Sequence, residues 1–281
     1  MKTLIAENRI KLSRFLLDSY EGGLSYSVFC KLLRKKDIKI NGKRVSSDVF
    51  VEKGDVINVY YDGEERARYD VVYRDEDVII VDKRKSVTSE ALFKLINDDF
   101  GGVYFCHRLD RNTDGLMLFA LNETAYESVL SAFKKKELTK VYSAKVYGSM
   151  PSAHAIENAY LTKDKDDAFV KVTAKKTSEQ SKKITTEYYV VKKDEDTSEL
   201  AVVLHTGRTH QIRAHLAYLG HFVLGDGKYG DEKLSKAFGA NEMQLSSVLL
   251  KLSFAKTDAL YRLNGKIFVK NGYENYVFYV K

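Results

Sequence analysis

Two spacings of hydrophobic residues alternate along the first part of the chain, and together they predict a small unit of helices and strands. Helical spacing marks residues 15–17 and again residues 25–36, where Ser25 has a side chain typical of a helix N-cap. The segment IKINGKRV then places Asn41 and Gly42 between two short apolar runs, the pair that favours a type I′ hairpin. A further apolar run, VINVYY, predicts another strand of this unit.

The later part of the chain shows a different pattern, in which strands follow one another through turns with few helices between them. Strands are predicted at residues 78–81, 116–121, 141–148, 185–191 and 200–206. Helices are predicted at residues 123–136 and 209–219, and a hairpin in the C-terminal stretch YRLNGKIFVKNGYENYVFYV. Because crossover helices are scarce, we expect an α+β fold with a mixed, mainly antiparallel central sheet and flanking helices.

A charged, weakly apolar stretch separates the two patterns and indicates a domain boundary. We assign residues 1–61 to a small basic domain, residues 62–70 to a linker and residues 71–281 to a larger domain that carries the candidate chemistry. No apolar run reaches the length of a membrane-spanning helix, and the two cysteines lie far apart in the sequence. We therefore expect a cytoplasmic protein that does not enter a membrane.

The charge of the chain indicates a polyanionic partner. The formal net charge is +7, and Lys and Arg gain affinity for polyanions by displacing counterions from phosphate groups. The small domain concentrates seven of these residues in its second helix and hairpin: Lys31, Arg34, Lys35, Lys36, Lys39, Lys43 and Arg44. Most such runs are only solvated helix faces, but this one continues across a turn onto strands, which favours nucleic-acid binding.

Asp110 lies in the segment HRLDRNTDG, a predicted loop between two apolar stretches. The flanking guanidinium groups of Arg108 and Arg111 favour an ionised carboxylate, and such a carboxylate can act as a nucleophile or a base. The alternative is a purely structural salt bridge, and the spacing alone gives the two interpretations equal weight. We predict that His107, Arg108 and Arg111 contact the substrate.

The segment TGRTHQIRAH offers a second group of polar side chains at the start of a predicted helix. A helix N-terminus with an arginine beside it suits a phosphate group. We therefore predict that Arg208, His210 and Gln211 bind the substrate. Arg213 lies off the apolar stripe of this helix and is free to face a carboxylate.

Tyr142 is the third candidate, in the predicted strand VYSAKVYG. Strict alternation places Tyr142 on the same face of the strand as Ala144. A tyrosine in this position is most often part of the core. It gains a role in chemistry if that face meets the Asp110 loop, because its ring could then stack on a base and its hydroxyl could relay a proton.

Two other patterns resemble binding motifs but lack the necessary context. His205, His210 and His215 are spaced by five residues, which does not place two ligands on one helix face, so we expect no metal site. The segment GDGKYG satisfies the dinucleotide pattern G-x-G-x-x-G, but no strand, crossover helix and second strand surround it. We therefore expect no nucleotide cofactor, and a nucleotide-binding oxidoreductase is the rival that a cofactor titration would test.

Three ordered segments together resemble the RluA-type family of pseudouridine synthases: HRLDRNTDG, KVYSAKVYG and TGRTHQIRAHLAYLGHFVLGDGKYG. By this resemblance Asp110 corresponds to the family's essential aspartate, Tyr142 to the tyrosine that contacts the target uracil, and Arg213 to the basic partner of the aspartate. Arg108 resembles an arginine associated with base flipping. The stretch SVFCKLLRKKDIKINGKRV is similar to an RNA-binding domain named after a small-subunit ribosomal protein.

The resemblance implies an enzyme that isomerises uridine in RNA without a cofactor or metal. The glycosidic bond is broken, the uracil turns, and a carbon atom replaces nitrogen as the link to ribose. The carboxylate either attacks the ribose carbon or removes a neighbouring proton, and the sequence leaves both routes open. We expect large-subunit ribosomal RNA as the partner, and a monomeric enzyme. The rival within this resemblance is a non-catalytic RNA-binding or ribosome-assembly factor.

The sequence departs from the family pattern at three places. Residues 84–87 replace a proline-glycine turn, Phe222 replaces a proline, and Asp114 replaces a serine and adds a second carboxylate close to Asp110. None of these changes removes a proposed catalytic group. They are the observations that favour the non-catalytic rival, whereas the intact Asp110, Tyr142 and Arg213 favour the enzyme.

Overall fold

A computed structural model of the 281 residues describes the chain except for residues 21–23, 25, 62–67, 164–168 and 281. The predicted N-cap Ser25 and residues 62–67 of the predicted linker lie outside the described residues. Among the helices that the structure describes, none combines the length and the hydrophobicity needed to cross a membrane.

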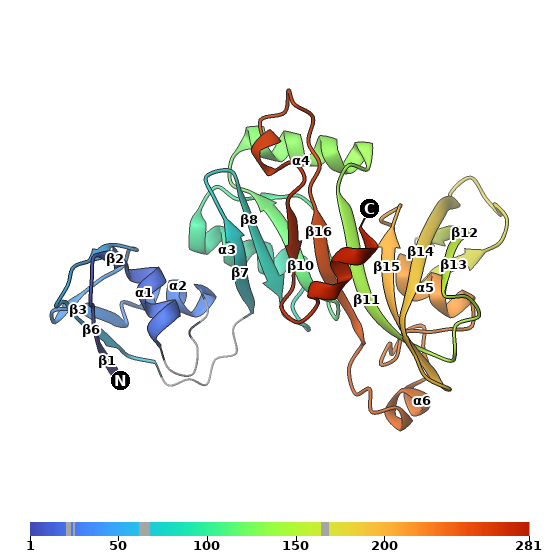
Figure 1. The fold of residues 1–281 in the computed structure, drawn as a ribbon, viewed down its shortest axis with the longest axis horizontal. Coiled ribbons are helices and arrows are strands. Elements are labelled where there is room, and N and C mark those ends of the chain that lie inside the picture. Colours follow the sequence, from blue (N-terminus) through green and yellow to red (C-terminus); the bar gives the residue numbers. More distant parts are fainter. Residues whose placement is uncertain (21–23, 25, 62–67, 164–168, 281) are drawn as a thin grey trace.

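Two helices and two small sheets form the N-terminal unit, which lies at one end of the long axis of the molecule (Figure 1). The helices are α1 (Leu12–Ser19) and α2 (Tyr26–Lys35), and the strands are β1 (Lys2–Ile5), β2 (Ile10–Lys11), β3 (Ile38–Ile40), β4 (Lys43–Arg44), β5 (Phe50–Val51) and β6 (Val56–Val59). Their buried side chains, from Ala6 to Val59, form a hydrophobic cluster of their own. The predicted hairpin is confirmed, since β3 pairs with β4 and both Asn41 (φ 49°) and Gly42 (φ 78°) have positive φ, as a type I′ turn requires.

The rest of the described chain is built on one large mixed sheet. Its strands are β7 (Tyr69–Arg74), β8 (Val78–Lys83), β9 (Tyr104–Phe105), β10 (Asp114–Ala120), β11 (Thr139–Tyr147), β12 (His154–Lys163), β13 (Val170–Thr173), β14 (Lys182–Lys193), β15 (Thr197–Leu204), β16 (Leu245–Lys251) and β17 (Ile267–Val269). The strand order is β13-β12-β14-β15-β11-β16-β10-β8-β7, with β17 on β16 and β9 on β10. Within the described residues only β10 and β16 run parallel, so the mixed, mainly antiparallel sheet is confirmed.

Both faces of this sheet are covered, which explains why strands such as VIIV are apolar at every position. Ile79 and Val81 belong to one core together with residues of α3 and α5, whereas Val78 and Ile80 belong to another core together with α4. These helices are α3 (Ser89–Phe100), α4 (Glu123–Lys135) and α5 (Gln211–Tyr218), and a short α6 (Glu232–Ala237) follows them. The α3 and α5 face is the face that carries the candidate site.

The prediction of a C-terminal hairpin was wrong. Of that stretch only β17 is a strand, and it pairs with the distant β16. The remainder forms two short 3-10 helices, η1 (Tyr261–Leu263) and η2 (Glu274–Tyr279). Tyr276 of η2 is buried against the back of the sheet, where its hydroxyl donates to Ser143 Oγ at 2.9 Å. Burial of this tyrosine outweighs the local tendency of the segment to pair with itself.

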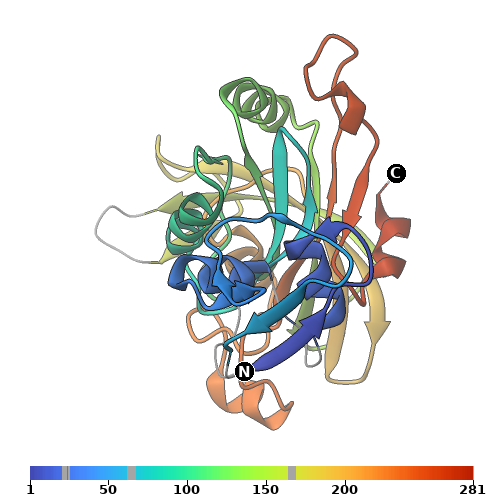
Figure 2. The same ribbon diagram turned by 90° about the vertical axis from the view of Figure 1, so that its left-hand side faces the viewer.

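The N-terminal unit contacts the large sheet through α2, and Figure 2 shows it in front of the sheet when the molecule is viewed along its length. The ring of Tyr26 stacks on that of Phe100 at the end of α3, with centroids 5.1 Å apart. Arg74 of β7 lies over the same Phe100 ring, and Arg34 forms an ion pair of 2.9 Å with Asp99. The contact is therefore made by an aromatic pair and a charged pair side by side.

Candidate active site

The Asp110 loop connects β9 to β10 and is fastened on both sides of the aspartate. Before it, the Ser89 hydroxyl accepts from the Leu109 amide at 2.9 Å and donates to the Leu109 carbonyl at 2.8 Å. After it, the buried Lys83 ammonium donates to the Arg111 carbonyl at 3.2 Å. Because both neighbours are held, the direction of the Asp110 side chain is fixed before any substrate binds.

Gly115 brings this loop close to the strand that carries Tyr142. It has φ +108°, and a Cβ atom built on it would lie 2.1 Å from the carbonyl oxygen of Ser247. Only glycine therefore allows the parallel approach of β10 to β16 at this point. Ser247 of β16 is the register partner both of Gly115 on β10 and of Tyr142 on β11. The Asp110 loop, which leads into β10, therefore lies close to Tyr142.

Tyr142 lies on the face of β11 predicted from its alternation, in the same core as Ala144 and Val146. Its side chain is buried but lines the pocket below Asp110. Burial raises the pKa of the Tyr142 hydroxyl, and the negative charge of Asp110 raises it further. The phenol therefore stays protonated at neutral pH and can serve as a flat surface and a hydrogen-bond donor, not as a base.

Arg213 is bound between two carboxylates. Its Nε and one terminal nitrogen donate to the two oxygens of Asp226, both at 2.7 Å, and its other terminal nitrogen donates to Asp110 Oδ2 at 2.9 Å. Burial alone would lower the pKa of Arg213, but the bonds to both carboxylates raise it. A guanidinium held this way presents one terminal nitrogen to Asp110 in a fixed direction.

His210 lies on the other side of the same carboxylate. Its Nε2 is 3.8 Å from Asp110 Oδ2, and its Nδ1 shares a hydrogen bond of 2.9 Å with the hydroxyl of Tyr229. Burial lowers the pKa of His210 more than Asp110 raises it. His210 has the left-handed backbone conformation (φ 55°) immediately before α5, which turns its side chain toward the carboxylate.

Gln211 and Arg208 occupy the predicted segment but do different things. The side-chain amide of Gln211 is hydrogen-bonded to other groups of the protein. Its oxygen accepts from the Thr206 hydroxyl and from the backbone amide of Arg208. Its nitrogen donates to the Thr185 carbonyl and to the Thr186 hydroxyl. Gln211 therefore shapes the loop before α5. The side chain of Arg208 is exposed at the rim of the pocket, where it can reach an anion.

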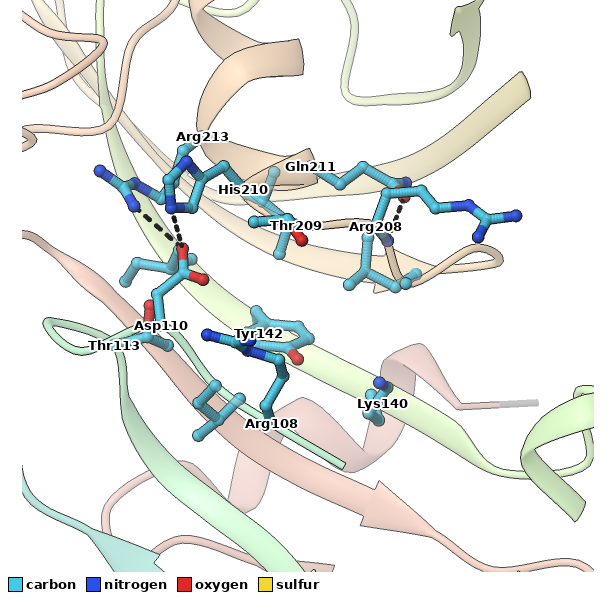
Figure 3. Close-up of a pocket in the computed structure, with 15 residues that line it drawn as sticks. Arg108, Asp110, Thr113, Lys140, Tyr142, Arg208, Thr209, His210, Gln211 and Arg213 are labelled. Atoms are coloured by element: carbon cyan, nitrogen blue, oxygen red, sulfur yellow. Dashed lines mark hydrogen bonds and ion pairs between the residues drawn. The ribbon is translucent and has the colours of Figure 1, made fainter. Parts of the chain in front are cut away.

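These residues line one pocket, which opens to solvent (Figure 3). Asp110, His210 and Arg213 gather at one end, Lys140 and Arg208 lie at the other, and Tyr142 lies between them. The structure thus brings together Arg108, Asp110, Tyr142, Arg208, His210, Gln211 and Arg213.

Three predicted positions do not belong to this pocket. His107 Nε2 accepts from the Leu118 amide at 2.9 Å, and burial lowers its pKa to about 3, so the imidazole is a neutral structural group. Arg111 turns away and donates to the Ser86 carbonyl at 3.4 Å. Asp114 is bound to Lys270 at 2.7 Å and lines a separate hollow, so it adds no second carboxylate to the site.

The flanking arginines also do not neutralise Asp110 as expected. Arg108, exposed at the mouth of the pocket, has Glu90 as its acidic partner at 3.6 Å. Arg111 contacts a carbonyl, as described above. The guanidinium that contacts Asp110 comes from Arg213, far away in the sequence. Sequence neighbours on a loop point in different directions, and only the tertiary fold decides which charge is near.

Three residues of the site were not singled out from the sequence. Asp226 and Tyr229 lie in GDGKYG, which the dinucleotide test dismissed as a whole; the ring of Tyr229 lies under the Arg213 guanidinium at 5.2 Å. Lys140 lines the pocket with Tyr142. The period-two alternation used for Tyr142 would have found Lys140, since it lies two residues earlier on the same strand face.

The two remaining departures from the family pattern are accommodated locally. In residues 84–87, the Lys83 ammonium donates to the carbonyls of Arg84 (3.1 Å) and Val87 (2.9 Å), and Ser86 takes the left-handed conformation of the turn. Phe222 stacks on Tyr147 with ring centroids 5.1 Å apart. In the part of the chain that the structure describes, no three His, Cys, Asp or Glu side chains are grouped to hold a metal ion.

Comparison with known proteins identifies relatives of the chain. Residues 71–218, more than half of the chain, match the family model described as RNA pseudouridylate synthase. An uncharacterized RNA pseudouridine synthase of Bacillus subtilis, YjbO, is 30% identical over 216 residues, which cover 69% of this chain and 75% of the relative. The ribosomal large subunit pseudouridine synthase C of Vibrio parahaemolyticus is 25% identical over 268 residues, covering 85% and 83%. The solved structure of human RNA pseudouridylate synthase domain containing 1 has a TM-score of 0.60 at 27% identity, covering 68% of this chain and 81% of that one.

Proposed function

Since this chain belongs to the RNA pseudouridylate synthase family, we propose that Asp110 is the carboxylate with which it isomerises uridine in RNA. One observation carries the assignment: Asp110 is held at 2.9 Å by Arg213 in a pocket floored by Tyr142 and open to solvent. The three side chains come from distant parts of the sequence. Their convergence supports the roles that the family resemblance implies for them.

The proposed chemistry uses each of these groups at a different stage. Asp110 either attacks the ribose carbon of the glycosidic bond or removes the adjacent ribose proton, and the carboxylate position supports both routes. Arg213, itself oriented by Asp226, holds the carboxylate in its reactive direction. Tyr142 provides the flat surface on which the freed uracil turns.

A uridine in folded RNA must leave its stack to reach Asp110, at a cost of a few kcal/mol. Arg108 is placed to support that extrusion, because its side chain is exposed at the mouth of the pocket. Arg208 at the opposite rim is a suitable contact for a backbone phosphate, since no ion pair binds it within the described residues. His210 completes the wall beside the carboxylate.

For the substrate we propose large-subunit ribosomal RNA. This rests on relatives whose names carry that specificity and on the basic N-terminal unit. Lys35, Lys36, Lys43 and Arg44 are exposed there and available for phosphate groups. The division into a unit up to residue 61 and a catalytic domain is supported by the separate N-terminal core and by the start of the family match. The catalytic domain begins at Tyr69 and not at residue 71, because Tyr69 and Asp70 of the predicted linker belong to β7 of the large sheet. We further propose that the enzyme acts as a monomer in the cytoplasm.

The first prediction concerns Asp110. The D110N variant should form no pseudouridine while binding RNA within about twofold of wild type, because it loses the carboxylate but keeps the shape of the side chain. D114N is the matched control: it changes a carboxylate of the same segment that faces Lys270, and should retain conversion. Tritium release from transcripts of large-subunit ribosomal RNA and of transfer RNA carrying 5-³H-uridine measures turnover, and carbodiimide-blocked primer extension maps the site.

Three outcomes would contradict the role of Asp110, the substrate or the activity, respectively. Normal conversion by D110N would exclude Asp110 as the reactive group. Conversion of the transfer RNA transcript alone would exclude the proposed substrate and leave the chemistry intact. Binding of ribosomal RNA by the wild-type chain without any release of tritium would favour the rival function, an RNA-binding or ribosome-assembly factor on a synthase scaffold.

A further inference from the structure

Lys140 is a lysine inside the candidate active site to which the proposed function assigns no role. It lies two residues before Tyr142 on β11, and the intervening Val141 packs on the opposite face of the sheet. Lys140 and Tyr142 therefore project to the same side and line the same pocket. Figure 3 shows Lys140 at the end of the pocket away from Asp110, with the Tyr142 ring between them.

The Lys140 ammonium has no acidic partner in the described part of the chain. Its one contact of note is the face of the Phe133 ring, with Nζ 5.1 Å from the centroid. Among the other cations of the pocket, Arg213 is bound to two carboxylates and Arg108 has Glu90. Arg208 also has no ion pair within the described residues, but its side chain is exposed to water, whereas Lys140 is half-buried. A half-buried charge without a counter-ion is costly for the free protein, which indicates that the missing partner arrives with the substrate.

The reaction supplies negative charge at this end of the pocket. When the bond between uracil N1 and ribose C1′ breaks, the electron pair stays on the base and spreads over N1, O2 and O4. With the ribose at Asp110 and the uracil on Tyr142, the base would extend toward Lys140, because Lys140 lies beyond Tyr142 at the end of the pocket away from Asp110. The charge develops only after bond cleavage begins, so a cation waiting there would bind the transition state more tightly than the substrate.

We infer that Lys140 is a further catalytic residue, whose ammonium group donates a hydrogen bond to a uracil carbonyl oxygen and stabilises the departing base as an anion. This inference rests on the proposed function of Asp110. Lysine keeps its proton throughout: the electron pair that leaves with the base returns to C1′ when C5 forms the new bond. C5 then loses its proton to water and N1 takes one up from water, so that atoms and charge balance. Lys140 thus holds the uracil while it turns between the two bonds.

The local environment fits this task. Burial lowers the pKa of Lys140 to about 8, so the group is still largely protonated at neutral pH but is less strongly hydrated than a surface lysine. Gly207 lies next to its Nζ, since a Cβ atom built on Gly207 would come to 3.6 Å from it. The absence of a side chain at Gly207 leaves room for a ring carbonyl beside the ammonium.

The test compares K140M and K140R with wild type in single-turnover reactions on large-subunit ribosomal RNA transcripts carrying 5-³H-uridine. We expect K140M to lose about 100-fold in rate, the scale for removing one donor to a developing anion. Its dissociation constant for RNA should stay within about twofold of wild type. K140R keeps the charge and should recover most of the rate. The thermal stability of K140M should equal or exceed that of wild type, because an unpaired charge is removed.

The pH profile separates this role from a structural one. The ammonium is present below pH 8 and is lost as the pH rises through about 8. The wild-type rate should therefore fall between pH 7 and 9, while the K140R rate should not, because arginine stays charged in this range. A structural role of the side chain would not move this profile.

Three results would overturn the inference. An unchanged K140M rate would show that no anion is stabilised there. Weaker RNA binding with a smaller salt dependence at an unchanged rate would show that Lys140 binds a backbone phosphate instead. No tritium release by the wild-type chain would refute this inference together with the proposed function, whereas normal wild-type release with either of the first two results would refute the role of Lys140 alone.

Discussion

At the scale of single residues, the site depends on a buried carboxylate, Asp226, that does not line the pocket. Asp226 is fully buried and binds two nitrogens of Arg213, leaving the third nitrogen for Asp110. Burial alone would raise the pKa of Asp226, but hydrogen bonds from Arg213 and from backbone amides lower it, so the carboxylate stays ionised. Asp226 is therefore a positioning residue: it acts on Asp110 through the guanidinium between them.

The second prediction follows from this arrangement. D226N should lose about 3 kcal/mol of unfolding free energy, because breaking a buried ion pair leaves the other charge uncompensated. Its rate of pseudouridine formation should fall by about tenfold or more, since Arg213 no longer has a fixed direction. Urea unfolding and tritium release measure the two effects. D231N is the control: Asp231 is an exposed N-cap of α6, and asparagine caps a helix equally well. Equal stability of the two variants would contradict the assignment.

At the scale of elements, the sequence predicted a helix or strand when its hydrophobic pattern lies within one segment. It did not predict which strands pair when they lie far apart in the chain. The apolar runs of β8 and β10 and the helical spacing of α4 were predicted correctly, because each pattern is complete within one segment. Helix α3 was missed although Thr88 caps it and Leu92 and Ile96 follow at helical spacing. The pairing of β17 with β16 and of β16 with β10 joins segments that no local pattern connects.

The same distinction applies to the site. Asp110, Tyr142 and Arg213 stand in motifs that can be recognised from the sequence, and the pocket brings them together. The partner of Asp110 was sought among its neighbours in the loop, although the contact spans more than a hundred residues. His107 was expected at the substrate because it lies near Asp110 in the sequence, yet the chain turns between them and leaves it under Phe133. Motifs thus identify the residues, and the fold assigns their partners.

The third prediction tests the strand contact that joins these parts. G115A should cost at least about 3 kcal/mol, because a methyl group would collide with the Ser247 carbonyl in addition to the strain of a positive φ. G102A is the matched control: Gly102 also has positive φ (60°) but has open space around it, so it should cost only about 1 kcal/mol. Thermal and urea unfolding give the comparison. Equal losses in the two variants would show that the approach of β10 to β16 is not tight.

At the scale of the whole molecule, the N-terminal unit uses part of its basic run to hold on to the catalytic part. Arg34 was predicted to bind RNA, but it is paired with Asp99, which is buried and also accepts from the Tyr69 hydroxyl at 2.5 Å. Burial raises the pKa of Asp99 to about 6, against the opposing effects of Tyr69 and Arg34. The remaining exposed lysines of this run belong to the unit that Arg34 and Tyr26 attach to the catalytic part.

The last prediction compares two neighbouring residues of α2: Arg34, which holds α2 against α3, and Lys35, which we expect to bind RNA. R34A should loosen the contact between α2 and α3 at pH 7.5, because it leaves the ionised Asp99 buried without its cation, and the radius of gyration from small-angle X-ray scattering should increase. K35A should leave the scattering unchanged, since the exposed Lys35 makes no ion pair among the described residues. It should instead weaken RNA binding and reduce its salt dependence by about one ion.

The effect of R34A on the scattering should depend on pH. Arg34 contributes an ion pair only while Asp99 is ionised, so its contribution is present above pH 6 and is lost as the pH falls through about 6. At pH 5 a neutral Asp99 needs no cation, and R34A and wild type should scatter alike. An R34A effect of equal size at pH 5 and pH 7.5 would mean that Arg34 does not act through the charge of Asp99. No effect of R34A at either pH would mean that the stacking of Tyr26 on Phe100, which carries no charge, is enough to hold the two parts together.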